Sequence, residues 1–241
     1  MADKNCLVSN DWICGKYLHN YRHELTDATV QHIWITAVSV AVGLLIAFPL
    51  ALIARRWRLA AGPVLAITTI LYTVPSLAMF SLLLPVFGIS PSLVVTGLVL
   101  YSLTILVRNI LAGLEAVPED VREAARAMGY GPLRLLFTVE LPLALPAVMA
   151  GLRIATVSTV ALTTVGAIID YGGLGNLLKS GIDSNFKAQV LAASVLCVVL
   201  AIIADVLLLG VQWLLTPWRH GRRTKAPRTR RTVEAEKVAA S

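Results

Sequence analysis

Long apolar segments alternate with short polar connections along most of this chain. A helix needs about 20 mainly apolar residues to cross the hydrocarbon core of a bilayer. Five segments reach that length, at about 31–54, 63–86, 91–113, 142–168 and 188–215. The pattern therefore predicts an all-α integral membrane protein with about five transmembrane helices.

Prolines interrupt three of the predicted spans, at Pro49, Pro75 and Pro146. A proline inside a helix has no backbone N–H to donate and favours a kink, so we expect bent but continuous helices at these positions. The same spans contain hydroxyl side chains and glycines, which suit close packing of helices on one another or a wet passage between them.

Basic residues mark one side of the membrane. They follow the first predicted span, occupy the 114–141 connection and fill the tail after the fifth span: Arg55, Arg56, Arg58; Arg122, Arg126, Arg134; Arg219, Arg222, Arg223, Lys225, Arg228, Arg230, Arg231, Lys237. Because Lys and Arg accumulate on the cytoplasmic side, these regions share that side. Five crossings then place an N-terminal leader, residues 1–30, outside the cell and the basic tail, residues 218–241, inside. The composition of the tail predicts disorder.

Composition narrows the class of protein further. The chain has 241 residues, of which 57% are hydrophobic and 15% charged. A typical soluble domain has about a quarter of its residues charged, so a soluble globular protein is excluded. The net charge of +7 comes largely from the tail. A basic run directly after a span is typical of membrane topology and of contact with anionic lipid, so we predict a lipid partner and no nucleic acid.

The polar connection between the third and fourth spans predicts two short helices. Pro118 suits a first helical turn, and the acidic residues after it complement the positive end of the helix dipole. This helix is expected to begin within residues 117–120, to run through Val121 to Met128 and to stop at Gly129, which can adopt a left-handed cap. A second helix is expected at 133–140, before a span that begins at Pro142.

A fixed spacing within this connection carries a resemblance. Glu123-Ala124-Ala125 is followed by Gly129, Val139 and Leu141-Pro142. The pattern resembles the coupling motif of permease subunits of bacterial ABC importers, in which isoleucine is usual where this chain has Val139. The resemblance implies a type I ABC importer permease fold whose cytoplasmic coupling helix docks on a separate ATP-hydrolysing subunit. We call residues 114–142 the coupling region.

The motif implies candidate coupling residues, which are Glu123, Ala124, Ala125, Gly129, Leu141 and Pro142. Glu123 is expected to fix the loop or to meet a basic edge of the partner, and Gly129 to permit the turn. Exposed Ala124, Ala125, Met128 and Tyr130 are expected to form a small, smooth docking surface.

Further segments resemble the osmoprotectant branch of these permeases over residues 31–217. They are residues 71–78, 107–109, 140–146, 150–153 and 172–175. The resemblance implies a permease domain for glycine betaine, carnitine, choline or proline betaine. Methionine, ergothioneine or another small zwitterion is an alternative solute. A membrane scaffold or sensor that recruits a cytosolic partner is an alternative of another class.

The resemblance also implies the partners and the location. The chain would be a non-enzymatic, multi-pass subunit of the bacterial cell membrane that binds no cofactor, since ATP and Mg would belong to the ATP-binding subunit. A second permease subunit, identical or paralogous, would complete the translocation pathway, and an extracytoplasmic solute-binding protein would deliver the solute. The Gly172–Gly175 loop would be a flexible closure against which that protein docks, or else an ordinary helix end and turn.

Charged residues at membrane depth are costly unless they are paired or hydrated. Arg153 in the fourth span and Asp205 in the fifth lie at similar depth, so we hypothesise an ion pair between them. In the alternative, Arg153 meets backbone carbonyls and Asp205 faces a water-filled gap. Arg108 and Asn109 lie near the inner end of the third span. They either take part in a similar polar contact or, as we expect, extend toward the lipid headgroups.

Cysteine and histidine residues offer one more candidate site. If the leader is extracytoplasmic, a disulfide between Cys6 and Cys14 is plausible, although spacing alone does not decide the pairing. His19 and His23 share a helix face near Cys14, but no further ligand pair completes a metal site, so none is predicted.

Overall fold

The computed structural model describes residues 6–220, apart from the side chains of Arg58, Arg219 and His220. Every regular element in this part of the chain is helical, which confirms the predicted all-α class. In chain order the elements are α1 (Gly15–Asn20), α2 (Arg22–Arg56), α3 (Arg58–Thr73), α4 (Ser76–Phe87), α5 (Pro91–Glu115), α6 (Glu119–Ala127), α7 (Pro132–Leu135), the π-helical turn η1 (Leu136–Glu140), α8 (Leu141–Thr163), the 3-10 helix η2 (Thr164–Ile169), α9 (Leu174–Asp183), α10 (Lys187–Leu215) and the 3-10 turn η3 (Pro217–His220).

Four helical stretches in the described chain are long and apolar enough to cross a membrane: Arg22–Arg56, Pro91–Glu115, Pro132–Ile169 and Lys187–Leu215. The pair α3 and α4 makes a fifth if it is counted as one broken span. The number of spans read from hydrophobicity is therefore confirmed.

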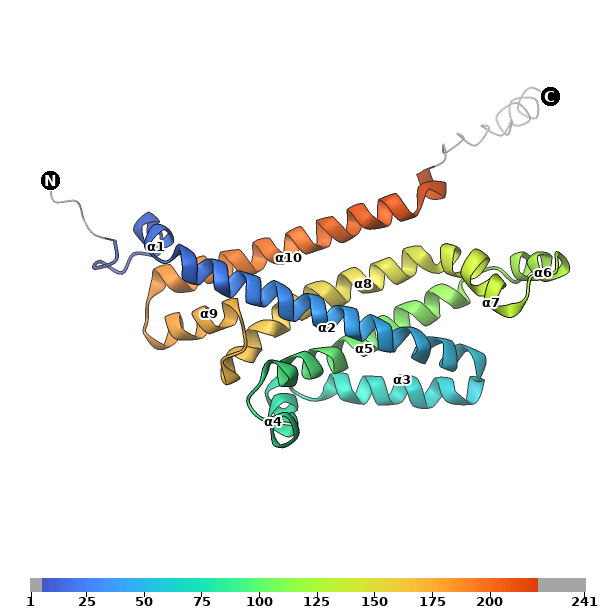
Figure 1. Ribbon diagram of the computed structural model, residues 1–241, viewed down its shortest axis with the longest axis horizontal. Helices are drawn as coiled ribbons and strands as arrows, with labels where there is room; N and C mark the ends of the chain where they lie inside the picture. Colours follow the sequence, from blue (N-terminus) through green and yellow to red (C-terminus); the bar gives the residue numbers. More distant parts are fainter. Residues whose placement is uncertain (1–5, 221–241) are drawn as a thin grey trace, which may run out of the picture.

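The second predicted span is broken rather than kinked, which corrects the expectation of one helix over 63–86. Its two parts, α3 and α4, meet at 101°, so that α3 runs along the bundle while α4 lies across it (Figure 1). Pro75 favours an extended conformation in the residue before it, and Val74 has φ −64° and ψ 128°. The Tyr101 hydroxyl donates a hydrogen bond to the Val74 carbonyl at the break. By contrast, Pro49 and Pro146 lie inside α2 and α8, which continue through them.

The α5 helix forms the centre of the bundle, between α2 and α8 (Figure 1). Leu106 and Ile110 of α5 are fully buried against a stripe of small residues on α2 that includes Ala47 and Ala51. On the other side, a Cβ added at Gly113 would lie 2.9 Å from the Cβ of Ala147 on α8. Lipid tails are as apolar as leucine, so this close contact, rather than transfer from water, holds the helices together.

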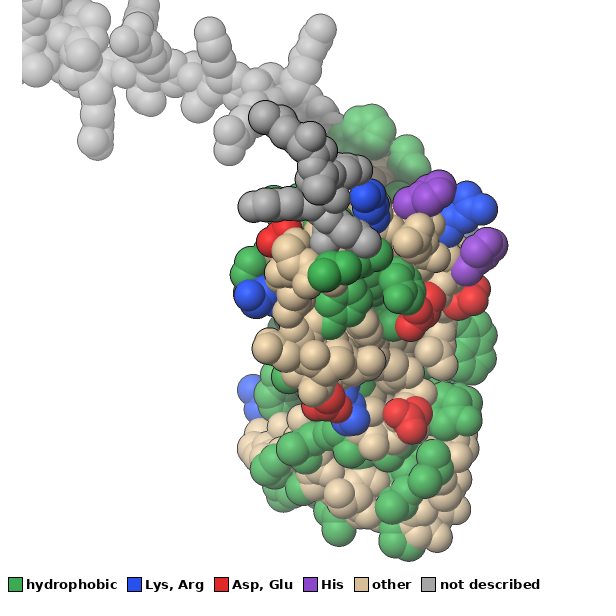
Figure 2. Space-filling model, turned by 90° about the vertical axis from the view of Figure 1, so that its left-hand side faces the viewer, with side chains coloured by type: hydrophobic (Ala, Val, Ile, Leu, Met, Phe, Trp, Pro, Cys, Tyr) green, Lys and Arg blue, Asp and Glu red, His purple; other side chains and the backbone are tan. Residues whose placement is uncertain are grey.

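The two ends of the bundle differ in content. One end gathers the junction of α2 with α3, the α6 and α7 helices, and the end of α10, while α1 and α9 lie at the other (Figure 1). Figure 2 views the α1 end, where charged and histidine side chains cluster in the upper part. The lower rim, where Figure 1 places α4, shows only apolar and uncharged side chains. This matches the sequence of α4, which has no charged residue.

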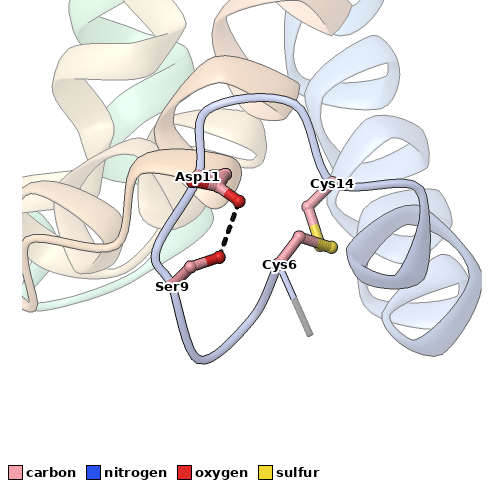
Figure 3. The surroundings of a disulfide bond; sticks show 4 residues. All are labelled: Cys6, Ser9, Asp11 and Cys14. Atoms are coloured by element: carbon pink, nitrogen blue, oxygen red, sulfur yellow. Dashed lines mark hydrogen bonds between the residues drawn. A yellow bond between two sulfur atoms is a disulfide. The ribbon is translucent and has the colours of Figure 1, made fainter. Parts of the chain in front are cut away.

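The leader is more structured than a simple polar extension. The first spanning helix begins at Arg22, so the residues just before 31 belong to α2. A disulfide joins Cys6 to Cys14, with 5.5 Å between their Cα atoms (Figure 3). The side-chain amide of Asn10 donates to the Asn185 carbonyl at 2.8 Å. These contacts attach the leader to the connection between α9 and α10. The predicted disorder of the basic tail concerns residues that lie almost entirely outside the described chain.

The glycine loop at the same end is buried. Gly173 has φ +55°, and a Cβ at this position would lie 2.7–2.8 Å from the Cβ and backbone atoms of His32 on α2. A Cβ at Gly172 would lie 2.4 Å from the amide nitrogen of Ala167. Only glycine fits at these two positions in this conformation, and the role of the loop as a closure against which a binding protein docks stays a prediction.

Candidate functional site

The α6 helix lies where the sequence predicts a coupling helix, and it begins at Glu119, within the expected start at residues 117–120. The Glu119 carboxylate accepts hydrogen bonds from Arg122 at 2.8 Å and from Arg126 at 3.0 Å. The bond from Arg122, together with that from Arg126, holds the pKa of Glu119 below its ordinary value. The first turn of the helix is thereby stabilised by an acidic residue at its positive end.

Gly129 ends the helix in the left-handed conformation, with φ +84°. Its amide donates to the Arg126 carbonyl at 2.9 Å, and the amide of Tyr130 donates to the Ala125 carbonyl at 3.2 Å. These bonds satisfy carbonyl groups at the end of α6. A Cβ at Gly129 would have no other atom within 4 Å. Glycine is therefore needed here for the backbone conformation and not for space.

The second predicted helix is not separate from the fourth span. The α7 helix continues through η1 into α8, so that Pro132–Ile169 form one helical stretch. Pro142 has no N–H to complete a regular hydrogen-bond ladder, and a π-helical turn directly before it shifts the register of that ladder by one residue. Leu141 and Pro142 therefore lie, half-buried, in the first turn of α8.

A buried carboxylate holds the coupling region to the bundle. Glu140, 4% exposed, accepts a hydrogen bond from Arg55 of α2 at 2.7 Å. Its second oxygen lies 3.1 Å from Nε of Arg122 on α6. Arg122 also donates to the carbonyl of Leu114 in α5 at 2.6 Å. Glu140 thus joins the ends of α2, α5 and α6 to the start of α8. Sequence reasoning missed this network, although a lone acid between arginine-rich connections was its signal.

The outer surface of α6 is partly as expected. Glu123 and Ala124 are exposed, and Glu123 has no hydrogen bond or ion pair with the described residues, so it does not fix the loop. Ala125 is only 2% exposed, which corrects the prediction that both alanines face outward. A helix that packs against α7 and η1 must turn one face inward, and the small Ala125 allows that contact.

Apolar side chains project around this helix. Met128, Leu133 and Phe137 are 69%, 72% and 55% exposed. Tyr130 is half-buried, with the Arg134 guanidinium 4.5 Å from the centre of its ring. A groove of about 710 Å³ lies between Tyr130 and Leu133 on one side and the end of α2 on the other. Exposed apolar groups ringed by charges are typical of a surface that binds another protein.

The structure brings Arg153 and Asp205 together across α8 and α10. Nε of Arg153 lies 2.8 Å from one Asp205 oxygen, and an Nη lies 2.7 Å from the other. This two-point geometry is the strongest form of an arginine–carboxylate pair. The pair lies in a groove of about 600 Å³ whose other walls include Ile154, Val157 and Ile202. Each charge is neutralised locally, which permits both at membrane depth.

Arg108 and Asn109 behave differently from each other. The Asn109 amide donates to the Ile105 carbonyl at 2.8 Å and packs over Gly151. Arg108 is exposed and donates to the Thr69 hydroxyl on α3 at 2.8 Å. The contact with Thr69 contradicts the expected extension toward the headgroups, because Thr69 lies deeper in the membrane than Arg108.

Comparison with known families decides the class of this protein. The family described as "Binding-protein-dependent transport system inner membrane component" matches residues 31–220. The chain belongs to this family. It is therefore a multi-pass membrane component of a bacterial transport system, and the matched region includes the coupling region and all the predicted spans.

Named relatives of this permease lie in the osmoprotectant branch. It is 38% identical to the osmoprotectant import permease protein OsmW of Salmonella typhimurium, over 80% of this chain and 92% of that protein. It is 37% identical to the carnitine transport permease protein OpuCD of Listeria monocytogenes, over 80% and 87% of the two chains. The choline transport system permease protein OpuBB of Bacillus subtilis is 31% identical, over 84% and 93%.

Solved structures share the fold of this permease. A chain of the MetNI methionine ABC transporter in inward-facing conformations has a TM-score of 0.71 at 21% identity, covering 82% of this chain and 98% of that one. An amino acid ABC transporter crystallised with histidines has a TM-score of 0.70 at 17% identity, covering 83% and 98%. The predicted type I ABC importer permease fold is thereby confirmed.

Proposed function

We propose that this permease is the transmembrane subunit of an ATP-driven, binding-protein-dependent importer of small osmoprotectants such as glycine betaine, carnitine or choline. The observation that carries the proposal is the identity of 38%, 37% and 31% to relatives named for osmoprotectant, carnitine and choline transport, each over about four-fifths of the chain.

The coupling region would bind a separate ATP-binding subunit, which would carry ATP and Mg. Exposed Glu123, Ala124 and Met128 form the contact surface in this proposal. The Glu140 network supports it, because the buried carboxylate before α8 contacts Arg55 of α2 and Arg122 of α6, and Arg122 in turn bonds the Leu114 carbonyl of α5. A displacement of α6 would therefore be transmitted to α2, α5 and α8 together, as in the rigid-body movements of packed helices.

The remaining partners follow from the orientation that we propose. The coupling region faces the cytoplasm, and the leader and α9 face outward, toward a solute-binding protein. A disulfide at the leader supports this orientation, since disulfides persist in oxidising compartments outside the cytoplasm. A second permease subunit would complete the pathway, and membrane lipid would cover the apolar outer side of α10.

Reconstitution tests the transport proposal. The permease, its ATP-binding subunit and its second permease subunit are placed in liposomes with ATP inside and the solute-binding protein outside. We expect uptake of labelled glycine betaine that depends on ATP and is not inhibited by methionine. Uptake inhibited by excess methionine would favour the alternative solutes. The absence of any ATP-dependent uptake by a folded complex would favour a scaffold or sensor.

Cysteine labelling tests the orientation. In a Cys197→Ala background, Ala124→Cys on α6 and Asn20→Cys on α1 are treated with a membrane-impermeant maleimide in intact cells. We expect labelling at position 20 and none at position 124 until the membrane is opened. The reverse pattern would place the coupling region outside the cell and reject its role.

A further inference from the structure

Two arginines lie at membrane depth in this permease, and only one has an acidic partner. Arg153 makes a two-point pair with Asp205. Arg108, by contrast, uses one Nη group to donate to the Thr69 hydroxyl at 2.8 Å, and it forms no ion pair within residues 6–220. The Thr69 hydroxyl itself donates to the Leu65 carbonyl at 2.6 Å, so it offers the guanidinium a lone pair. Most of the five N–H donors of Arg108 have no acceptor in the described chain.

Helix register shows which way Arg108 points. The Thr104 hydroxyl of α5 donates to the Thr68 carbonyl of α3, so these two residues lie at the same level of an antiparallel pair. Arg108 is one turn closer to the coupling region and lies level with about Val64. Its guanidinium nevertheless reaches Thr69, about 7 Å deeper at 1.5 Å of rise per residue. The side chain extends toward the middle of the membrane, opposite to the direction that headgroup contact requires.

A charge in this position needs water or an anion. An exposed guanidinium that faces lipid at this depth would be strongly unfavourable. The exposed surface of α10 shows the contrast, because its outward side chains, such as Val198, Ile203 and Leu207, are apolar. On α3, Ile67 and Ile70 are also exposed, so the need for water concerns the part of the α3–α5 surface around Arg108 and Thr69 and not all of α3.

An aromatic ring lies beside the arginine. Tyr72 follows Thr69 by three residues on α3, which places the two side chains on one face, about 5–6 Å apart between Cβ atoms. Tyr72 is 46% exposed. Its ring packs edge-on against Tyr101, with 6.0 Å between the ring centres. Tyr101 is held in turn by its hydrogen bond to the Val74 carbonyl. Tyrosine rings attract quaternary ammonium groups through the negative charge of their faces.

We propose that Arg108, Thr69 and Tyr72 form a solute-contact site on the wall of the translocation pathway, specific for small zwitterions that carry a carboxylate and a quaternary ammonium. The guanidinium binds the carboxylate, and the Tyr72 ring contacts the ammonium one helical turn deeper. The solute class rests on the proposed function. The presence of an anion-attracting, water-filled wall at Arg108 does not, and it is tested separately.

Thr73 provides a reporter for the electrostatic part. It is exposed, lies one turn from Thr69 on the same face, and leaves the contact between Arg108 and Thr69 intact when changed. Thr73→Cys is introduced with Cys197→Ala in the complete complex. It is then treated with a sulfonate methanethiosulfonate reagent, which is negative, and with the trimethylammonium reagent, which is positive. Rates are measured without nucleotide and with ATP and vanadate.

We expect the negative reagent to react about fivefold faster than the positive one. The positive charge of Arg108, about 7 Å from position 73, attracts the negative reagent and repels the positive one. Arg108→Gln should bring the ratio to one or below. Arg22→Gln, which removes an exposed arginine at the start of α2, should leave the ratio unchanged. No reaction in either nucleotide state would place this wall against lipid or a second subunit and overturn the proposal. A ratio insensitive to Arg108 would also overturn it.

Uptake of two solutes tests the recognition part. Glycine betaine carries a carboxylate, whereas choline has the same quaternary ammonium without one. Arg108→Gln should lower glycine betaine uptake at least about tenfold, as loss of a charge-assisted bond predicts, and choline uptake much less. Tyr72→Phe should retain uptake that Tyr72→Leu loses. Equal losses for both solutes, or full activity of Tyr72→Leu, would reject solute recognition here. A wild-type complex that imports neither solute, but keeps the labelling ratio, would reject the proposed function alone.

Discussion

Gly129 at the coupling end and Gly173 at the opposite end both adopt left-handed conformations, with φ of +84° and +55°. They differ in their surroundings. A Cβ at Gly129 would have no atom within 4 Å, whereas one at Gly173 would lie within 2.8 Å of His32. The coupling end thus needs glycine only to turn the chain, and its surface remains free for a partner. The opposite end needs glycine because α2 and the loop are in direct contact.

The forces that hold the two ends differ in the same way. At the coupling end, ion pairs and hydrogen bonds converge on Glu140, while apolar side chains such as Leu133 and Phe137 remain exposed. At the opposite end, a disulfide, the tight glycine contacts and the buried Tyr17 hold the leader and α9 against the spans. One end leaves apolar side chains exposed, and the other is held closed by its own contacts.

The largest loss of stability is expected for Gly173→Ala. Strain in the left-handed conformation and overlap with the backbone of α2 together should cost about 3 kcal/mol, which lowers the thermal midpoint of the detergent-solubilised protein. Gly88→Ala is the matched control. Gly88 has φ +61° and ψ −167°, a region almost restricted to glycine, and no atom lies within 4 Å of its Cβ, so strain alone should cost about 2 kcal/mol. Equal losses at the two positions would contradict the distinction between conformation and packing.

Glu140→Gln should have the next largest effect. It leaves Arg55 and Arg122, whose side chains are 21% and 13% exposed, without a carboxylate. Breaking a buried pair costs 3–5 kcal/mol, and partial exposure of the arginines reduces this to about 2 kcal/mol. Glu119→Gln removes an exposed acid that pairs with Arg122 and should change the thermal midpoint much less. If the two variants unfold at the same temperature, Glu140 does not hold the coupling region.

Removal of the disulfide should have a local effect, confined to the leader. Cys6 and Cys14 are separated by 8 positions, and closing a loop of this size stabilises by about 2.5 kcal/mol in the chain-entropy model. The double change Cys6→Ser and Cys14→Ser should therefore speed proteolysis and amide exchange in the leader while α6 stays protected. Cys197→Ala, which retains the disulfide, is the control. Faster exchange in α6 would mean that the two ends are not independent.

Gly129→Asp should cost the least stability, below about 1 kcal/mol, because aspartate tolerates the left-handed region and its Cβ meets no neighbour. Its effect should appear in transport, with ATP hydrolysis retained and uptake reduced more than tenfold, because a charged side chain projects from the docking surface. Gly131→Asp is the control for charge. It introduces the same charge two residues away, where φ is −70° and aspartate causes no backbone strain. Unchanged uptake with Gly129→Asp would remove this turn from coupling.

Much of the fold follows from hydrophobic pattern, because the bilayer demands long apolar helices wherever the chain crosses it. The spans were predictable for this reason, and the cap at Gly129 because glycine readily ends a helix in the left-handed conformation. The bend between α3 and α4 was less so, since a proline can kink a helix or end it, and the hydrogen bond from Tyr101 to Val74 is made between distant residues. The burial of Ala125 depends on α7, which a helix taken alone does not reveal.

The site residues likewise divide into those that local sequence predicts and those that depend on distant contacts. A motif of fixed spacing predicts Glu123 and Gly129 as coupling residues, because such a motif is a local property of the sequence. The partners of Glu140 and Arg108 come from helices distant in sequence, and a charge pattern cannot choose among several arginines or hydroxyls.

The sequence by itself determined the membrane class, the spans and the coupling motif, because hydrophobicity and spacing are local properties. Only the tertiary structure decided where the charges are neutralised: Arg153 by Asp205, Arg55 and Arg122 by Glu140, and Arg108 by no acid in the described chain. The physical reason is that an electrostatic interaction depends on distance in space, and packing of helices far apart in the sequence sets that distance.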